Sequence, residues 1–182
     1  YAENFDGMNT GGTPPAGWSF FGLLGGGNAT WTNATGIPAS GVGGGTLNNT
    51  LTATTTFTTS SDSAGFNYAL PATPADRAVG TAPTGGQGVV WQLALTNTTG
   101  AAINAFRLRY DIRRFTAPAA NQLPGYWLFS SVDGGVTWQN VSALNPTLTG
   151  PAGVIVPTTA GVTMVPATAV ALGSPWAAGG SL

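Results

Sequence analysis

A strict alternation of apolar and polar side chains over residues 106–113 constrains the fold of this chain more than any other feature. Phe106, Leu108, Tyr110 and Ile112 share one parity, and arginines and an aspartate stand between them. Successive side chains of a β-strand point to opposite faces of its sheet, so this pattern predicts a strand with one buried face and one solvated face.

The rest of the chain favours an all-β fold. Glycine (28 residues) and proline (13 residues) recur along the 182 residues, and runs of period two replace helical spacing. We expect further strands near residues 17–23, 29–33, 46–59, 64–70, 152–157, 161–165 and 167–172. Short strands at this spacing are typical of two packed antiparallel sheets.

Two β-hairpins are predicted. Residues 89–95 alternate in the same way as residues 106–112, and the turn-forming sequence TNTTG (96–100) lies between them. In the second hairpin, the strands 126–132 and 136–141 flank Asp133-Gly134-Gly135, whose glycines can adopt the left-handed backbone angles of a tight turn. We expect Val136 and Trp138 to face inward in this hairpin.

Four of the five basic residues lie within residues 91–115, and all four are arginines. Arg107, Arg109 and Arg113 share the polar face with Asp111. One interpretation is a docking stripe for sugars or acidic groups, with Trp127 from a following strand stacked on a guanidinium group. The other is a structural network with Asp111 that also protects a sheet edge from association.

The composition excludes several classes of protein. Charged residues make up 6% of the chain and the formal net charge is −1, so we expect neither nucleic-acid binding nor membrane insertion. Histidine, cysteine and lysine are all absent, which removes serine–histidine relays, thiol nucleophiles and Schiff bases. We therefore predict that the chain is not an enzyme. Hydrolysis by a carboxylate pair is the remaining catalytic alternative.

The acidic N-terminal stretch YAENFDGM could bind calcium. Glu3 and Asp6 would supply hard oxygen ligands, which Ca²⁺ prefers. The alternative is a solvated acidic segment without a metal ion. Five Asn-x-Ser/Thr sequons, at Asn28, Asn33, Asn48, Asn97 and Asn140, are expected by chance in a chain so rich in asparagine and threonine.

We expect the chain to be secreted or displayed on a cell surface. It begins at Tyr1, as a protein does after removal of a signal peptide, and it carries few sites for a basic-specific protease. The absence of cysteine fits a bacterial exported protein better than a small disulfide-stapled one.

Several segments carry a family resemblance. The start ENFDGM, followed by TPPAGWSF, resembles the start of the secreted bacterial β-sandwich modules called choice-of-anchor J, which are related to cleaved-adhesin and MAM-like jelly rolls. The blocks at residues 76–81, 95–115 and 129–144 resemble segments of large secreted or surface-anchored bacterial proteins. Together these segments span most of residues 1–144.

The resemblance implies a jelly-roll-like β-sandwich of two antiparallel sheets, formed by residues 1–182 as one domain, with an exported location and no catalysis. Some relatives bind calcium near the N-terminus, and relatives continue into one more strand, which here would be missing or supplied by another segment. We predict adhesion or surface and filament assembly with other copies or surface proteins, anchored near Trp176. The alternative is a carbohydrate-binding module, free-standing or accessory to a secreted enzyme, that binds polysaccharide.

Overall fold

The computed structural model describes residues 1–24, 46–48, 50–55, 65–81, 87–114, 127–145 and 161–182. Within these ranges the chain is mostly β, as predicted, and its helices are the short 3-10 turns η1 (Asp6–Met8) and η3 (Ser142–Leu144). The strands form several small sheets without closing a barrel in the described ranges. The two-sheet sandwich therefore stays a prediction, and the strands expected near 29–33 and 152–157 lie outside the described residues.

The contacts of the chain divide it into two compact units. Unit 1 comprises Tyr1–Ala29 and Gly44–Leu93, and unit 2 comprises Thr30–Gly43 and Ala94–Leu182. No helix in the described ranges is both long enough and apolar enough to cross a membrane.

Unit 1 contains two three-stranded sheets among its described residues. The first sheet has the strand order β2 (Thr46–Leu47), β1 (Trp18–Leu24), β6 (Gln87–Leu93). The second sheet has the strand order β3 (Thr52–Thr54), β4 (Gly65–Leu70), β5 (Thr73–Thr81). The β3–β4 pair is parallel and the others are antiparallel. The strands predicted at 17–23 and 64–70 are thus confirmed.

The core of unit 1 forms around Phe20, which is fully buried on β1. Phe20 packs with Met8 and Leu51, and its ring centroid lies 4.9 Å from that of Trp91 on β6. Gly65 begins β4 against this core, where a Cβ atom would lie 2.8 Å from Phe20 Cε2. The aromatic side chains therefore fill the space that a larger residue at position 65 would need.

A buried amide fixes the N-terminal segment of unit 1 on β4. Asn67 is fully buried, and its Nδ2 donates to the carbonyl oxygens of Asn9 at 3.0 Å and Gly11 at 2.8 Å. The Asp6 carboxylate in η1 adds a bond to β5, because its Oδ1 accepts from the backbone N–H of Arg77 at 2.8 Å.

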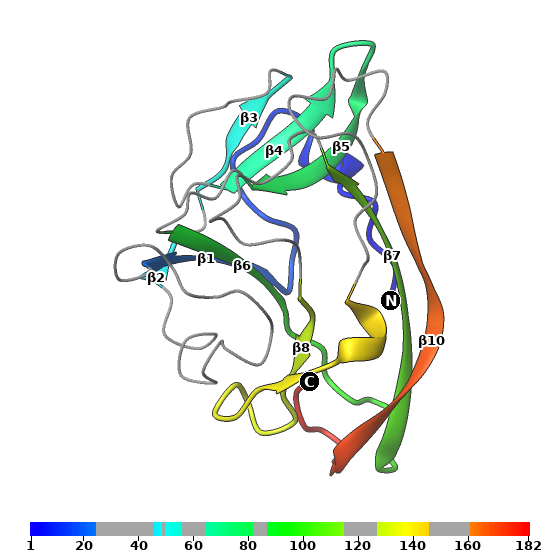
Figure 1. Cartoon of the computed structure of the whole chain (residues 1–182). Helices are drawn as coiled ribbons and strands as arrows, with labels where there is room; N and C mark the ends of the chain where they lie inside the picture. The colour runs from blue at the N-terminus through cyan, green and yellow to red at the C-terminus, as the bar shows by residue number, and fades with distance from the viewer. Residues whose placement is uncertain (25–45, 49, 56–64, 82–86, 115–126, 146–160) are drawn as a thin grey trace. The chain divides into compact units, whose positions relative to one another are not determined.

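Unit 2 is organised by a long antiparallel ribbon of β7 (Ile103–Arg114) and β10 (Gly161–Trp176), which run side by side in green and orange in Figure 1. A short hairpin of β8 (Phe129–Ser130) and β9 (Gln139–Asn140) lies in the same unit. The segments predicted as separate strands, 161–165 and 167–172, are one strand whose register shifts between Val165 and Thr168. Pro166 occupies this irregularity, where a strand tolerates a missing N–H.

The alternation on β7 is confirmed. Phe106, Leu108 and Tyr110 are half-buried and pack against the buried residues Val141, Leu144 and Val170, whereas Arg107, Arg109 and Asp111 are exposed. The Tyr110 hydroxyl donates to the carbonyl of Leu144, and burial raises the pKa of Tyr110 to about 12. The apolar face of the ribbon therefore holds η3.

Asn97 connects the segment that follows Ala94 to the C-terminal end of unit 2. The residue is 2% exposed, and its Nδ2 donates to Ala101 O at 2.8 Å and Trp176 O at 3.0 Å. Its Oδ1 accepts from the backbone N–H and the hydroxyl of Thr99, at 3.0 and 2.7 Å. Main-chain bonds between Leu95 and Leu182 continue the same connection.

The predicted hairpin between 89–95 and 106–112 is wrong. Strand β6 pairs with β1 over seven residue pairs, and β7 pairs with β10. The TNTTG segment does not make a reversing turn between adjacent strands, because Asn97 and its neighbours bond to the C-terminal segment instead. Long-range pairing thus prevails over the local pairing that the sequence pattern suggested.

The second predicted hairpin is confirmed in its pairing, since Phe129 pairs with Asn140 and Ser130 with Gln139. The paired strands are shorter than expected and the connection is longer. Val136 is 79% exposed, so the expectation that it faces inward is wrong, whereas Trp138 is half-buried. The backbone N–H groups of Gly135 and Thr137 donate to Ser131 and Asp133 within the connection, and Val136 between them is exposed to solvent.

Replacing Asn97 tests the connection between the two ends of unit 2. Asn97→Ala removes the donor to two carbonyl groups and is expected to lower the free energy of unfolding by about 1–3 kcal/mol. Urea unfolding followed by tryptophan fluorescence measures the change. Asn104→Ala, at an exposed position of β7, is the control and should change it by less than about 0.5 kcal/mol. Equal effects of the two variants would contradict the structural role of Asn97.

Candidate functional site

The candidate site in unit 2 begins with the loop that joins β8 to β9. In the sequence SVDGGVTW (131–138), the Asp133 carboxylate accepts from the Ser131 hydroxyl at 2.7 Å and from the Thr137 hydroxyl at 2.5 Å. The backbone N–H of Thr137 also donates to Asp133, at 2.9 Å. Gly134 and Gly135 have φ angles of 73° and 87°, a region that favours glycine. Asp133 thus organises the turn, as its position in the sequence predicted.

These bonds determine the ionisation of Asp133. Its pKa is lowered from 3.8 to about 2, first because the Thr137 hydroxyl bonds the carboxylate and then because the Thr137 N–H and the Ser131 hydroxyl do so. Hydrogen bonds to the charged form of an acid favour that form. Asp133 is therefore an anion at neutral pH, and its oxygens already have donors.

The opposite wall of the site is an irregular part of β10. Ala171 pairs with Ala105 and Trp176 pairs with Ile103. The paired positions are therefore five residues apart on β10 but only two residues apart on β7. The extra residues lie in the segment 172–175, which leaves the ladder as a bulge. Bulges of this kind redirect side chains and are common beside functional sites.

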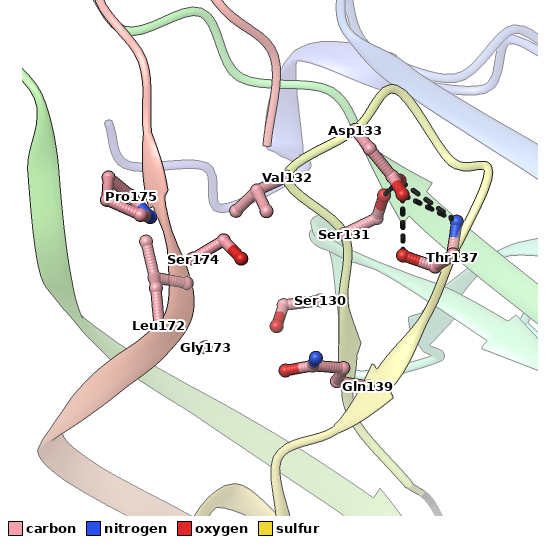
Figure 2. Close-up of a pocket in the computed structure, with 10 residues that line it drawn as sticks. All are labelled: Ser130, Ser131, Val132, Asp133, Thr137, Gln139, Leu172, Gly173, Ser174 and Pro175. Carbon is pink, nitrogen blue, oxygen red and sulfur yellow. Dashed lines mark hydrogen bonds between the residues drawn. The ribbon is translucent and has the colours of Figure 1, made fainter.

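The loop and the bulge line an open cavity of about 230 Å³, and Figure 2 shows the residues that line it. Ser130 and Gln139 form a cross-strand pair of the β8–β9 hairpin, and Ser174 faces them from the bulge. Within the described part of the chain, the side chains of these three residues make no hydrogen bond. The cavity therefore presents several polar groups that a ligand can satisfy.

Close packing places Gln139 at the cavity. A Cβ atom on Gly173 would lie 2.8 Å from Gln139 Oε1 and 3.1 Å from its Nε2. The amide of Gln139 therefore lies directly against the bulged strand at Gly173. Because this amide ends a flexible, exposed side chain, a larger residue at position 173 would displace it from the cavity.

The predicted arginine stripe is partly formed. Arg107 and Arg109 lie exposed on one face of β7 with Asp111, but no ion pair joins either of them to Asp111 among the described residues. The side chain of Arg113 lies outside the described residues. Trp127 is half-buried and precedes β8, which pairs with β9 and not with β7. Both interpretations of the stripe, as a docking surface and as a structural network, stay predictions.

Trp176, predicted as an anchor of association, is 7% exposed within unit 2. Its Nε1 donates to Gly180 O at 2.8 Å, and its own carbonyl accepts from Asn97. The side chain therefore stabilises the C-terminal segment and presents little surface for association. The anchoring role of Trp176 stays a prediction.

The acidic residues Glu3 and Asp6 have structural partners. Glu3 Oε1 accepts from the N–H of Phe5 at 2.7 Å, and Asp6 Oδ2 accepts from Asn4 Nδ2 at 2.7 Å. Within the described ranges, no group of three or more acidic residues gathers to hold a metal ion. Calcium prefers six to eight oxygen ligands, and both alternatives for Glu3 and Asp6, a calcium site and a solvated acidic segment, stay predictions.

Comparisons with protein-family models, with curated proteins and with solved structures give no match for this chain.

The cavity residues Ser130, Gln139 and Ser174 were not predicted from the sequence. The signals were present, because Gly173-Ser174-Pro175 interrupts an otherwise apolar strand and Asp133 lies between serine and threonine. What the sequence could not show is that these two segments, about 35 residues apart, form the two walls of one cavity. Asn97 was likewise noted only as a sequon.

The Asp133 turn makes a prediction about pH. Because the folded pKa lies below 3.8, the carboxylate stabilises the turn fully above pH 3.8, and this contribution is lost as the pH falls toward about 2. Carboxyl-carbon NMR titration should give a pKa of about 2 for Asp133. Thr137→Val should raise that pKa, while Thr98→Val, at an exposed position, should leave it unchanged. Titration of Asp133 near 3.8 in the unaltered protein would show that these bonds do not persist in solution.

Proposed function

We propose that this chain is a non-catalytic extracellular β-module that associates with other copies of itself, or with surface proteins, through the edge of β10. The carrying observation is that β10 extends over Gly161–Trp176 and pairs on one side only, with β7, among the described residues. The unpaired N–H and C=O groups of a sheet edge offer hydrogen bonds to another strand.

The edge of β10 suits association better than the edge of β7. The sequence of β10 contains no charged residue, whereas β7 carries arginines at 107, 109, 113 and 114. Charged side chains on an edge strand discourage pairing with a further strand, and β10 lacks this protection. The bulges after Val165 and Ala171 limit the regular part of the edge to short segments.

The composition supports a role outside the cell and without chemistry. A surface built from threonine, asparagine and glycine, with 6% charged residues, has little electrostatic repulsion to keep copies apart. The absence of histidine, cysteine and lysine leaves few groups for catalysis. The start ENFDGM with TPPAGWSF resembles choice-of-anchor J modules, and on this resemblance we include an exported, jelly-roll-like sandwich in the proposal.

Association should depend on protein concentration and little on salt. Main-chain hydrogen bonds and apolar contacts carry it, so screening of charges removes little of its free energy. Light scattering at increasing concentration should show oligomers at both low and high ionic strength. A compact monomer at every concentration would contradict the proposal.

A matched pair of variants locates the associating edge. Ala171→Lys puts a charge on β10 of both copies and is expected to weaken association by about two- to fivefold, because like charges then face each other. Ala105→Lys is the control, since Ala105 is the exposed β7 residue that pairs with Ala171. Sedimentation equilibrium measures both constants. A larger loss in Ala105→Lys would assign association to β7 instead.

A further inference from the structure

We propose that the cavity between the β8–β9 loop and the β10 bulge binds a neutral ring rich in hydroxyl groups, such as one saccharide unit. The cavity involves the segment 172–175 of β10, which leaves the ladder with β7, and the proposal does not depend on self-association. Four features of the cavity carry it: its origin in a bulge, its unengaged polar groups, its charge and its apolar wall.

The bulge creates the cavity at a defined place. If β10 paired regularly with β7 up to Trp176, no residues of β10 would extend toward the β8–β9 hairpin. Instead the segment 172–175 leaves the β7–β10 ladder, and Ser174 faces Ser130. Asn97 fixes the far end of the bulge by bonding Trp176 O. Both ends of the bulge are therefore held, which preorganises the cavity.

The unengaged groups match the hydrogen bonding of a polyol. The hydroxyl groups of Ser130 and Ser174 can each donate and accept, and the Gln139 amide offers two donors and an acceptor. A sugar hydroxyl likewise donates and accepts, so neighbouring hydroxyl groups on one ring can bond to these three side chains together. Figure 2 shows the three side chains converging on one space.

The charge of the cavity excludes anions. Among the described residues that line it, Asp133 is the only charged one, and its carboxylate is ionised at neutral pH. No lining residue in the described ranges is cationic, so phosphate, sulfate or an acidic sugar would find repulsion without a partner. The Asp133 carboxylate already accepts hydrogen bonds from Ser131 and Thr137. The neutral side chains of the cavity are therefore the ones that bind the ligand.

The apolar part of the wall consists of Val132, Leu172 and Pro175. These side chains can pack against the C–H face of a sugar ring while the polar groups bond to its edge. No aromatic ring lines the cavity among the described residues. Binding therefore depends on hydrogen bonds in an open site, and we expect dissociation constants in about the millimolar range.

The test is an NMR titration of the full chain, labelled with ¹⁵N, with the methyl glycosides of glucose, galactose, mannose and N-acetylglucosamine. At least one sugar should shift the side-chain NH₂ signals of Gln139 in a saturable way. Gln139→Ala and Ser174→Ala should each weaken that sugar's binding by about five- to tenfold, as the loss of one hydrogen bond predicts. Gly173→Ala should also weaken it, because the added methyl group displaces the amide.

A control variant distinguishes binding in this cavity from binding elsewhere on the chain. Ser142→Ala, an exposed serine of η3 outside the cavity, should leave the dissociation constant unchanged. Retained amide spectra will show that each variant is folded. Tighter binding of an oligosaccharide than of its monosaccharide would assign the source to a polysaccharide chain, and equal binding would assign it to a terminal or free sugar. Both results support the site.

Three results would overturn the proposal. One is the absence of saturable shifts with every sugar. Another is sugar binding that Gln139→Ala and Ser174→Ala leave unchanged, since the ligand would then lie elsewhere. The third is stronger binding of N-acetylneuraminic acid or inorganic phosphate than of the neutral sugars, which would contradict the inference from charge.

Discussion

The hydrogen bonds of Asn97 hold together the features of unit 2 from which both proposals arise. One buried amide closes the turn at residues 97–101 and bonds the carbonyl of Trp176. The segment before β7 and the end of β10 therefore meet at one side chain. The donor and acceptor capacity of the amide is used in full, which offsets the cost of burying it. An aliphatic residue at this position would leave carbonyl groups without partners.

From this connection the form of β10 follows. Trp176 must reach Ile103, where the ladder with β7 ends, and the residues between Ala171 and Trp176 exceed what the ladder can take up. They form the bulge at 172–175, whose far side lines the cavity. The same strand leaves its outer edge without a partner in the described residues. One strand thus supplies both the surface for association and a wall of the proposed sugar site.

The sequence predicted what depends on local pattern. The alternation of Phe106, Leu108 and Tyr110 with arginines indicated the two faces of β7 correctly, and the glycines after Asp133 indicated the turn of the β8–β9 hairpin. These features follow from the period of a strand and from backbone angles that glycine adopts easily. They do not depend on which distant segment becomes the neighbour.

The remaining features depend on distant partners, and the predictions from sequence failed there. Nothing near β6 indicates that it pairs with β1 and not with β7, because both pairings bury the same apolar face. The role of Asn97 was hidden because asparagine is usually exposed, and the burial of Trp176 depends on the tail that covers it. The cavity residues belong to two segments that only the folded chain brings together.

The outer edge of β10 is proposed to be open in the single chain and to pair with another copy, and this is the central claim. Amide hydrogen exchange at low and high protein concentration tests it most directly, because it reads main-chain bonds at each residue. We predict that outward-facing amides of β10 exchange quickly in dilute solution and slow with rising concentration, while amides of β1 keep their rates. Exchange along β10 that is slow in dilute solution and independent of concentration would contradict the claim.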